Sequence, residues 1–144
     1  MTSSVRPPTT VDDCRLIELP RIGNSKGELT FLENCRHVPF EIRRVFYLYG
    51  VPPGGSRGSH AHKTLHQAMI CLAGSFDVLL DDGLQQRTVR LERPWEMLYV
   101  PPMIWDAELN FTAGSICLVM ASDLYDEADY IRDYDAFLAA ARYS

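Results

Sequence analysis

The apolar residues of this chain fall into short runs bounded by turn residues, and this pattern limits the fold more than any other feature. Nine glycines and nine prolines separate runs that are rich in Val, Ile, Leu, Phe and Tyr. Short apolar runs between such residues are typical of β-strands. The 144 residues, 47% of them hydrophobic, suffice for one domain with a buried core. We therefore predict an all-β sandwich or barrel as a single domain over residues 1–144. The clearest expected strands cover residues 42–49, 65–72, 75–80, 85–91, 97–100, 105–109 and 116–121.

Two of these runs carry further information about their surroundings. In residues 42–49 apolar side chains alternate on both faces, so we expect a strand buried on both sides. The sequence Asp81-Asp82-Gly83 follows an alternating run and is a strong hairpin signal. We expect residues 85–91 to return beside residues 75–80.

The two ends of the chain differ from its middle. Residues 1–14 are expected to be a loose N-terminus, and residues 15–19 and 27–33 to be strands that could pair as a hairpin. Helix-forming residues follow a capping position at Ser122-Asp123, so residues 122–143 are expected to form a C-terminal helical segment that packs on the sheet.

Charge and cysteine usage exclude several classes of protein. The net charge of −5 argues against a general nucleic-acid binder, which needs a basic face. No apolar run approaches membrane-spanning length, and the N-terminus does not have the pattern of a signal peptide. The four widely spaced cysteines suggest neither a zinc knuckle nor a disulfide framework, and we expect reduced thiols in a cytoplasmic protein.

Local basic clusters nevertheless leave room for a small phosphate group. The candidates are Arg43-Arg44 and Arg57 with Lys63. Most charged surface residues have no partner, so solvation is the simpler interpretation for such pairs. Arg57 is the residue that we expect to bind, because of the histidines that follow it.

His60 and His62 are the strongest functional signal in the sequence. On a strand, residues two apart point to the same side of the sheet, so both imidazoles face one cavity. Imidazole titrates near neutral pH and also ligates metals. The pair therefore fits either proton transfer or the first coordination shell of a metal ion.

The residues around the pair resemble the first motif of the cupins. Gly54, His60, His62, Gln67 and Gly74 have its spacing, with Gln67 in the place of the usual glutamate. A weaker second motif begins at Pro101, with Asp106 where histidine is usual and Asn110 four residues later. The resemblance implies a jelly roll, also called a double-stranded β-helix. A metal-binding cupin would use His60, His62 and Asp106 as an Fe(II) or Zn(II) triad. Gln67 is left out of this triad because a neutral amide is a poor ligand in place of a carboxylate.

A closer resemblance covers about residues 17–137 and is to the sugar-nucleotide 3,4-ketoisomerases, cupins that act on dTDP-4-keto-6-deoxyglucose. The matching stretches are residues 39–47 (PFEIRRVFY), 57–63 (RGSHAHK), 79–83 (LLDDG) and 121–132 (ASDLYDEADYIR). The resemblance implies a homodimer of cupins, cytoplasmic deoxysugar biosynthesis, and two active-site histidines that need no metal or other cofactor. Carried over to this chain, the catalytic residues are His60 and His62, and the ligand is a dTDP-linked 4-keto-6-deoxy sugar.

Moving a carbonyl between adjacent carbons requires groups that both accept and donate protons, as a histidine pair does. The developing charge on the sugar oxygens needs hydrogen-bond donors, for which Arg57 and Tyr47 are candidates. Either aromatic candidate, Tyr47 or Trp105, could instead serve as a core residue. The full set of expected substrate-binding residues is Arg57, Tyr47, Lys63, Gln67, Trp105 and Asp106.

Three alternatives remain open from the sequence. The first is a metal-dependent cupin, the second a sugar-nucleotide-binding cupin without catalysis, and the third a histidine-dependent 3,5-epimerase. Metal content, ligand affinity without turnover, and the identity of the product distinguish them. Asp106 in place of histidine changes the charge of the cavity and the groups in it that can donate a proton. It could therefore change the side from which C4 is protonated, so the sequence does not decide between a galacto and a gluco product.

Overall fold

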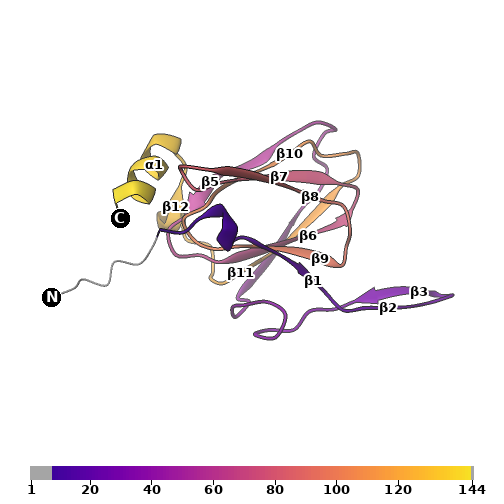
Figure 1. Cartoon of the computed structure of the whole chain (residues 1–144). Coiled ribbons are helices and arrows are strands. Elements are labelled where there is room, and N and C mark those ends of the chain that lie inside the picture. Colours follow the sequence, from indigo (N-terminus) through magenta and orange to yellow (C-terminus); the bar gives the residue numbers. More distant parts are fainter. Residues whose placement is uncertain (1–7, 144) are drawn as a thin grey trace.

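Antiparallel strands from two five-stranded sheets build the protein, of which this computed structural model describes residues 8–143 (Figure 1). The first sheet has the order β1-β9-β6-β11-β4, formed by Arg15–Glu18, Glu96–Val100, Gln67–Ala73, Ile116–Ala121 and Arg44–Leu48. The second has the order β12-β5-β10-β7-β8, formed by Tyr130–Ile131, Arg57–His62, Trp105–Leu109, Phe76–Asp81 and Gln86–Leu91. From β4 to β7 and from β8 to β12 each strand lies in the other sheet from the one before it. This crossing is the topology of a jelly roll, so the expected all-β cupin fold is confirmed.

The main core lies between the two sheets. Side chains alternate along each strand, so Met69 and Cys71 of β6 point inward while Ala68 and Ile70 point outward. On the facing sheet Val78 of β7 is fully buried in the same core. Burial of this apolar surface on both inner faces holds the sheets together.

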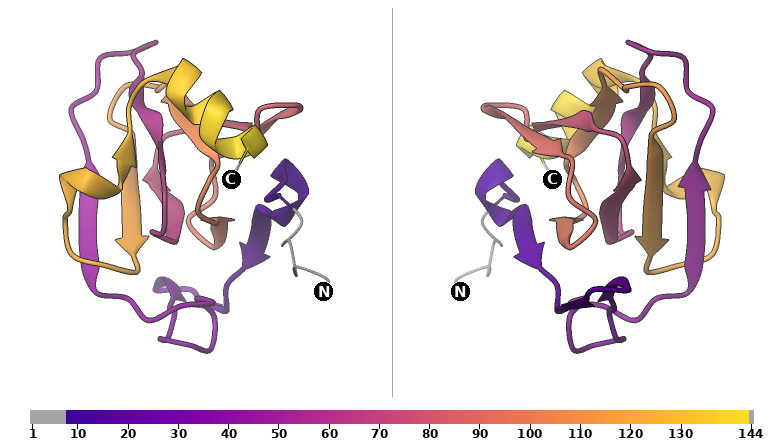
Figure 2. Two further views of the ribbon diagram at one scale, coloured as in Figure 1. Left: turned by 90° about the vertical axis from the view of Figure 1, so that its left-hand side faces the viewer. Right: turned by 90° about the vertical axis from the view of Figure 1, so that its right-hand side faces the viewer.

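Each outer face is covered by a different segment. The chain between β3 and β4 places Val38 and Phe40 against the outer face of the first sheet. The helix α1 (Tyr134–Tyr143) packs Phe137 against Ala61 and Ile131 of the second sheet. In Figure 2 the N-terminal segment and β4 lie on opposite sides of the sandwich, as expected for the two edges of one sheet. No helix within residues 8–143 is long and apolar enough to span a membrane.

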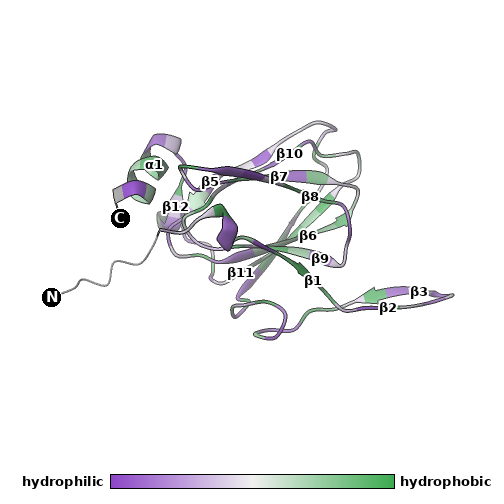
Figure 3. Cartoon of the chain, in the orientation of Figure 1, coloured by the Kyte–Doolittle hydropathy of each residue, from purple (hydrophilic) through white to green (hydrophobic). Residues whose placement is uncertain are grey.

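The N-terminal segment differs from the expectation in two ways. The predicted hairpin between residues 15–19 and 27–33 is wrong, because β1 pairs with β9 and forms one edge of the first sheet. The hairpin instead joins β2 (Arg21–Asn24) to β3 (Gly27–Thr30) and projects from the sandwich, with apolar residues along it (Figure 3). Residues 1–7 lie outside the described part. The expected looseness is also wrong for residues 8–14, where Thr10 caps a one-turn 3₁₀-helix and Val11 is buried.

The C-terminal helix begins twelve residues later than the predicted Ser122. Asp126 caps a short 3₁₀-helix, Glu127–Asp129, and the next two residues pair with β5 as β12. The amide of Ala136 then donates to the Asp133 carboxylate, which caps α1. Helical propensity in residues 122–133 loses to tertiary pairing with the strand that carries the histidines.

The strand β4 is buried on one face only, contrary to the prediction for residues 42–49. Phe46 and Leu48 pack against the core, whereas Val45, Tyr47 and Tyr49 are 55%, 60% and 72% exposed. The reason is that β4 is an edge strand whose outer face extends beyond the covering segment.

Candidate active site

A β-bulge in β5 determines which side chains share a face with the histidines. His60 lies opposite Asp106 of β10, but Arg57 lies opposite Glu108, so three residue steps on β5 match two on β10. Gly58 supplies the bulge with a φ of +73°, and a Cβ at this position would overlap the Glu108 carboxylate. Residues opposite each other in an antiparallel pair point to the same face. The bulge therefore places Arg57 on the face of His60, where regular alternation would have placed it on the other side.

The two histidines form a compact aromatic group with Tyr130 of β12. The ring centroids of His60 and His62 are 4.9 Å apart, with the rings nearly perpendicular. The Tyr130 ring lies 4.3 Å from that of His62 and 5.0 Å from that of His60. The guanidinium of Arg132 lies over the Tyr130 ring, 4.3 Å from its centroid, and Arg132 is paired with Glu127. The predicted histidine pair is thus walled by a segment that the sequence assigned to a helix.

His62 is oriented by a partly buried carboxylate. Its Nδ1 atom lies 3.1 Å from Oδ2 of Asp129, while Oδ1 of Asp129 accepts bonds from the amide and the hydroxyl of Thr64. Partial burial raises the pKa of the Asp129 carboxyl, but these hydrogen bonds outweigh burial and keep the pKa below its usual value. An ionised carboxylate can only accept, so Nδ1 of His62 carries the proton. Its Nε2 atom is then the free, basic nitrogen.

Both histidines are held in the neutral form. Burial, followed by the neighbouring His62 and Arg132, lowers the pKa of His60 to about 4. Burial also lowers the pKa of His62, although Asp129 acts in the opposite direction. Neutral imidazole is the form that accepts a proton, so the pair is ready to act as a base near neutral pH.

Buried polar side chains extend the histidine face along β10. The Gln67 amide at the start of β6 donates to Oδ2 of Asp106 at 2.6 Å. Asp106 and Glu108 are only 1% and 5% exposed, and Oδ1 of Asp106 and Oε2 of Glu108 have no partner among the described residues. Burial and the neighbouring Glu108 raise the pKa of Asp106 well above its usual value. Burial likewise raises the pKa of Glu108 to about 8.

These residues include the set that a metal-binding cupin would use, namely His60, His62 and Asp106. Here the position of the usual glutamate is an amide that donates to Asp106, and His62 uses its second nitrogen to contact Asp129. Within residues 8–143, no three His, Cys, Asp or Glu side chains converge as a group able to hold a metal ion.

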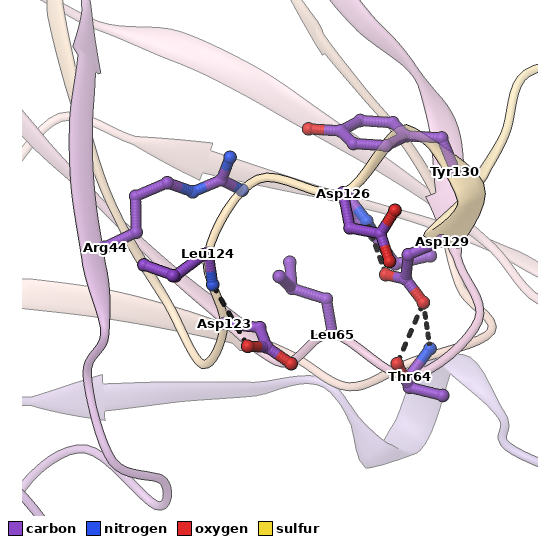
Figure 4. A pocket seen from close by; sticks show the side chains of 9 residues that line it. Arg44, Thr64, Leu65, Asp123, Leu124, Asp126, Asp129 and Tyr130 are labelled. Carbon is purple, nitrogen blue, oxygen red and sulfur yellow. Dashed lines mark hydrogen bonds and ion pairs between the residues drawn. The ribbon is translucent and has the colours of Figure 1, made fainter.

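A small pocket adjoins His62 on the side of Asp129 (Figure 4). It encloses about 30 Å³, and the chain between β11 and β12 closes it with Leu124 and Asp126. Arg44 enters from β4, with its guanidinium directed toward Tyr130 and Asp126 in Figure 4. The pocket has room for an oxygen atom or a water molecule but not for a nucleotide.

The structure brings five of the eight predicted site residues to one face and leaves three elsewhere. Arg57, His60, His62, Gln67 and Asp106 share the inner face near β5. Tyr47 lies on the outer face of β4, and Trp105 packs against Tyr134 and Phe137 of α1. Lys63 lines a shallow surface hollow with Arg132 and Ala136.

Several residues of the site were missed by sequence reasoning. Asp129 and Tyr130 reach the histidines only because β12 pairs with β5, across more than sixty residues of sequence. Their signal was the stretch 121–132, which carried the family resemblance but was interpreted as the start of a helix. Glu108 lies two residues beyond Asp106, and strand alternation alone could have placed it on the same face.

Comparison with known proteins agrees with this geometry. The sequence profile of the family described as "WxcM-like, C-terminal" matches residues 12–142. A curated relative from Aneurinibacillus thermoaerophilus, TDP-4-oxo-6-deoxy-alpha-D-glucose-3,4-oxoisomerase, is 42% identical over 123 residues, which cover 85% of this chain and 88% of that protein.

Solved structures give the same result. The sugar 3,4-ketoisomerase QdtA from Thermoanaerobacterium thermosaccharolyticum, in complex with TDP, superimposes with a TM-score of 0.90 at 38% identity, over 92% of this chain and 97% of that one. The TDP-quinovose 3,4-ketoisomerase WlaRB from Campylobacter jejuni gives a TM-score of 0.85 at 44% identity, over 89% and 98%. Extended identity and a shared fold, added to the histidine face, establish the family. The chain is a member of the WxcM-like sugar-nucleotide 3,4-ketoisomerase family of cupins.

Proposed function

We propose that this protein converts dTDP-4-keto-6-deoxyglucose into a dTDP-3-keto-6-deoxyhexose for deoxysugar biosynthesis in the cytoplasm. The observation that carries the proposal is the His62–Asp129 pair, which leaves Nε2 of a buried neutral imidazole free to act as a base. Relatives support the choice of substrate. A variant of QdtA has been solved with TDP-4-keto-6-deoxyglucose and is 38% identical to this chain, with a TM-score of 0.90.

The reaction moves two protons and no other atoms. A base removes the proton from sugar C3, the electrons form a C3–C4 double bond, and the former C4 carbonyl oxygen becomes negatively charged. Protonation of that oxygen gives the enediol. Return of a proton to C4, with loss of the O3 proton, then leaves the carbonyl at C3. Each step requires a group that exchanges protons near neutral pH.

We assign the first step to His62 and the second acid–base role to His60. When His62 accepts the C3 proton at Nε2, its imidazolium is stabilised by the Asp129 carboxylate at Nδ1. His60 has no such partner, and burial together with His62 and Arg132 gives it the lower basicity. Neutral His60 can accept the O3 proton of the enediol, and because it is the weaker base it then donates a proton readily to C4.

Arg57 fits the nucleotide side of the substrate. It is exposed at the start of β5 and makes no ion pair among the described residues. A guanidinium in such a place matches the geometry of a diphosphate. We assign Gln67 and Asp106 to the wall of the cavity that faces the sugar. Tyr47, Lys63 and Trp105 face other directions and are not part of this proposal.

We also propose a homodimer. Ile22 and Leu29 on the projecting hairpin are 62% and 56% exposed, and a two-stranded hairpin is marginally stable by itself. An apolar hollow of about 310 Å³, lined by Leu72 and Trp95 among others, lies on the same side of the first sheet. Apolar surface of this kind is typical of an interface, and a second copy offers the complementary hairpin. Light scattering that gave a mass near 16.3 kDa would contradict the dimer.

Proton NMR in deuterated water tests the activity. With EDTA-treated protein and dTDP-4-keto-6-deoxyglucose, we expect a 3-keto sugar with deuterium at C4, whose coupling constants give the configuration. His62→Asn should bind dTDP but produce no such sugar. Turnover that appears only after Fe(II) or Zn(II) is restored would instead favour a metal-dependent cupin. Binding without turnover in either condition would favour a non-catalytic sugar-nucleotide binder.

A further inference from the structure

The orientation of the His60 imidazole depends on contacts between rings. Within residues 8–143 no group makes a hydrogen bond with this imidazole, whereas that of His62 is fixed through Nδ1 by Asp129. The χ2 torsion of histidine has broad minima, so a ring without a hydrogen bond is not held in one plane by its own torsions. The ring centroid of His60 lies 4.9 Å from that of His62 and 5.0 Å from that of Tyr130. These two rings are therefore the groups that can orient it.

Tyr130 contacts both imidazoles. It lies opposite His62 in the antiparallel pairing of β12 with β5, which directs both side chains to the same face. Its ring lies 4.3 Å from that of His62 with 58° between the two planes, and its plane makes an angle of 67° with that of His60. The planes of His60 and His62 are themselves 83° apart. Three mutually inclined rings at such distances restrict one another's rotation, as close-packed side chains do in a protein interior.

The backbone of Tyr130 is held by the residues on both sides of it. The strand β12 is two residues long and forms an edge of the second sheet, so its pairing with β5 gives little stability by itself. The carbonyl of Asp129 accepts from the amide of Lys63, and the Ile131 side chain is buried in the same cluster as Ala61. Tyr130 is thus anchored against the strand that carries the histidines.

An ion pair supports the ring of Tyr130. The Arg132 guanidinium lies over this ring, 4.3 Å from its centroid. Two hydrogen bonds join Arg132 to Glu127, from Nε to Oε1 at 2.6 Å and from Nη2 to Oε2 at 2.9 Å. A guanidinium bound at two points keeps a defined plane, and its position over an aromatic face is favourable. Arg132 and Glu127 therefore help to keep Tyr130 in the position that contacts His60.

In the proposed reaction His60 accepts the O3 proton and returns a proton to C4, and both transfers require that its nitrogens point at the sugar. On the strength of the proposed function, we propose that Tyr130 is a positioning residue whose ring sets the orientation of His60 beside His62. His62 depends on this ring less, because Asp129 holds its imidazole independently. Loss of the Tyr130 ring should therefore affect the step of His60 more than the step of His62.

Two rates measured on Tyr130→Leu separate these steps. Deuterium exchange at C3 reports on His62, and isomerisation requires His60 as well. Misplacement of a catalytic group by about 1 Å can cost about 100-fold in rate, and we expect a decrease of this size in kcat for isomerisation. Exchange at C3 should fall by less than about tenfold, so the ratio of exchange to isomerisation should rise. The Kd for dTDP, which has no keto sugar, should stay within about threefold and serves to show that the variant is folded.

Tyr130→Phe and Tyr134→Leu are the controls. Phenylalanine keeps the ring without the hydroxyl, so we expect Tyr130→Phe to retain kcat and the wild-type ratio of rates. Tyr134 packs against the rings of Trp105 and Phe137 and contacts neither histidine. Tyr134→Leu therefore removes a second tyrosine that packs on aromatic rings, and it should lower stability without lowering kcat.

The pKa of His60, measured by NMR titration of its ring signals, tests the arrangement without substrate. Burial is the largest of the effects that lower this pKa to about 4. The titratable and charged groups that face His60 from the neighbouring segments are His62, Asp106, Arg132 and Glu127. Leucine covers less of the imidazole than tyrosine does, so we expect the pKa to rise toward 6.5 in Tyr130→Leu and to stay low in Tyr130→Phe. An unchanged pKa in Tyr130→Leu would mean that the Tyr130 ring does not cover His60, which contradicts the proposal.

Three kinetic results would overturn the role of Tyr130 while leaving the proposed function intact. They are an unchanged kcat in a folded Tyr130→Leu, equal losses of C3 exchange and isomerisation, and a Tyr130→Phe as impaired as Tyr130→Leu. A wild type that does not isomerise the substrate would instead contradict the proposed function, and this role with it.

Discussion

Nδ1 of His62 and Oδ2 of Asp129 lie 3.1 Å apart although the two residues are 67 positions apart in the sequence. Pairing of β12 with β5 creates this contact, since Tyr130 lies opposite His62 and brings the preceding aspartate beside the imidazole. The contact fixes the tautomer of His62, and a base with the wrong nitrogen protonated cannot accept a proton from the substrate.

Asp129→Asn should therefore impair proton transfer more than it impairs binding. The amide can donate to Nδ1, which would leave the proton on Nε2, the nitrogen that must be free. We expect kcat to fall about 100-fold or more, within the range for a general acid–base step, with the dTDP affinity preserved. Asp123→Asn is the control, because Asp123 lines the same pocket but bonds only the Leu124 amide. Equal kcat values in the two variants would argue against a tautomer-fixing role.

The pH dependence of catalysis should reflect the low basicity of the histidines. Burial, together with His62 and Arg132, lowers the pKa of His60 from 6.5 to about 4, and Glu127 opposes this only in part. The His60 imidazole therefore stays neutral at lower pH values than free histidine does. We expect the acid limb of kcat/KM to have its inflection between pH 4 and 6.5. Steady-state rates from pH 4 to 9 test this, and an inflection above 6.5 would mean that the pair is not desolvated.

Gly58→Ala should disrupt the bulge that aligns Arg57 with the histidines. The new methyl group meets the buried Glu108 carboxylate, and the φ of +73° is already unfavourable for alanine. Gly54→Ala is the matched control, because Gly54 has a φ of +78° but no atom near its would-be Cβ. We expect Gly54→Ala to lower the free energy of unfolding by about 1 to 2 kcal/mol from backbone strain alone. Gly58→Ala should lose about 1 to 3 kcal/mol more from overpacking, and equal losses in urea denaturation would show that the Glu108 contact is soft.

Sequence reasoning succeeded where a single local signal determines the structure. The turn at Asp81-Asp82-Gly83 was predicted from its Asp-Gly hairpin signal. In the structure the Asp82 carboxylate accepts from the amides of Leu84 and Gln85. Alternation in residues 75–80 likewise predicted the inward side chains of β7, and Val78 is fully buried. His60 and His62 share a face for the same reason.

Predictions failed where distant segments compete for a strand. Residues 15–18 had two possible partners, and only the folded sandwich brings β9 beside them in place of β3. Residues 122–133 favour a helix locally but gain more by pairing with β5, so Asp129 could not be placed beside His62 from propensity. The exposed side of Tyr47 depends on how far the covering loop extends across the sheet, which no periodicity encodes.

Glu108 should make the protein less stable as the pH rises through neutrality. Burial raises its pKa from 4.5 to about 8 in the folded state, so between these values the folded protein holds a proton that the unfolded chain releases. Stability is greatest below pH 4.5 with respect to this group, and it declines by at most about 1.4 kcal/mol per pH unit until the folded carboxyl ionises near pH 8.

Glu108→Gln removes the titration and should flatten this decline between pH 6.5 and 8. The control is Glu18→Gln, at an exposed strand position, which should keep the wild-type slope. His60 and His62 act in the opposite direction, since burial lowers their pKa values and stability rises with pH toward 6.5, so the three proteins must be compared at the same pH values. Urea denaturation at pH 5, 6.5 and 8 is the measurement, and an identical slope in Glu108→Gln and the wild type would mean that the carboxyl is ionised throughout.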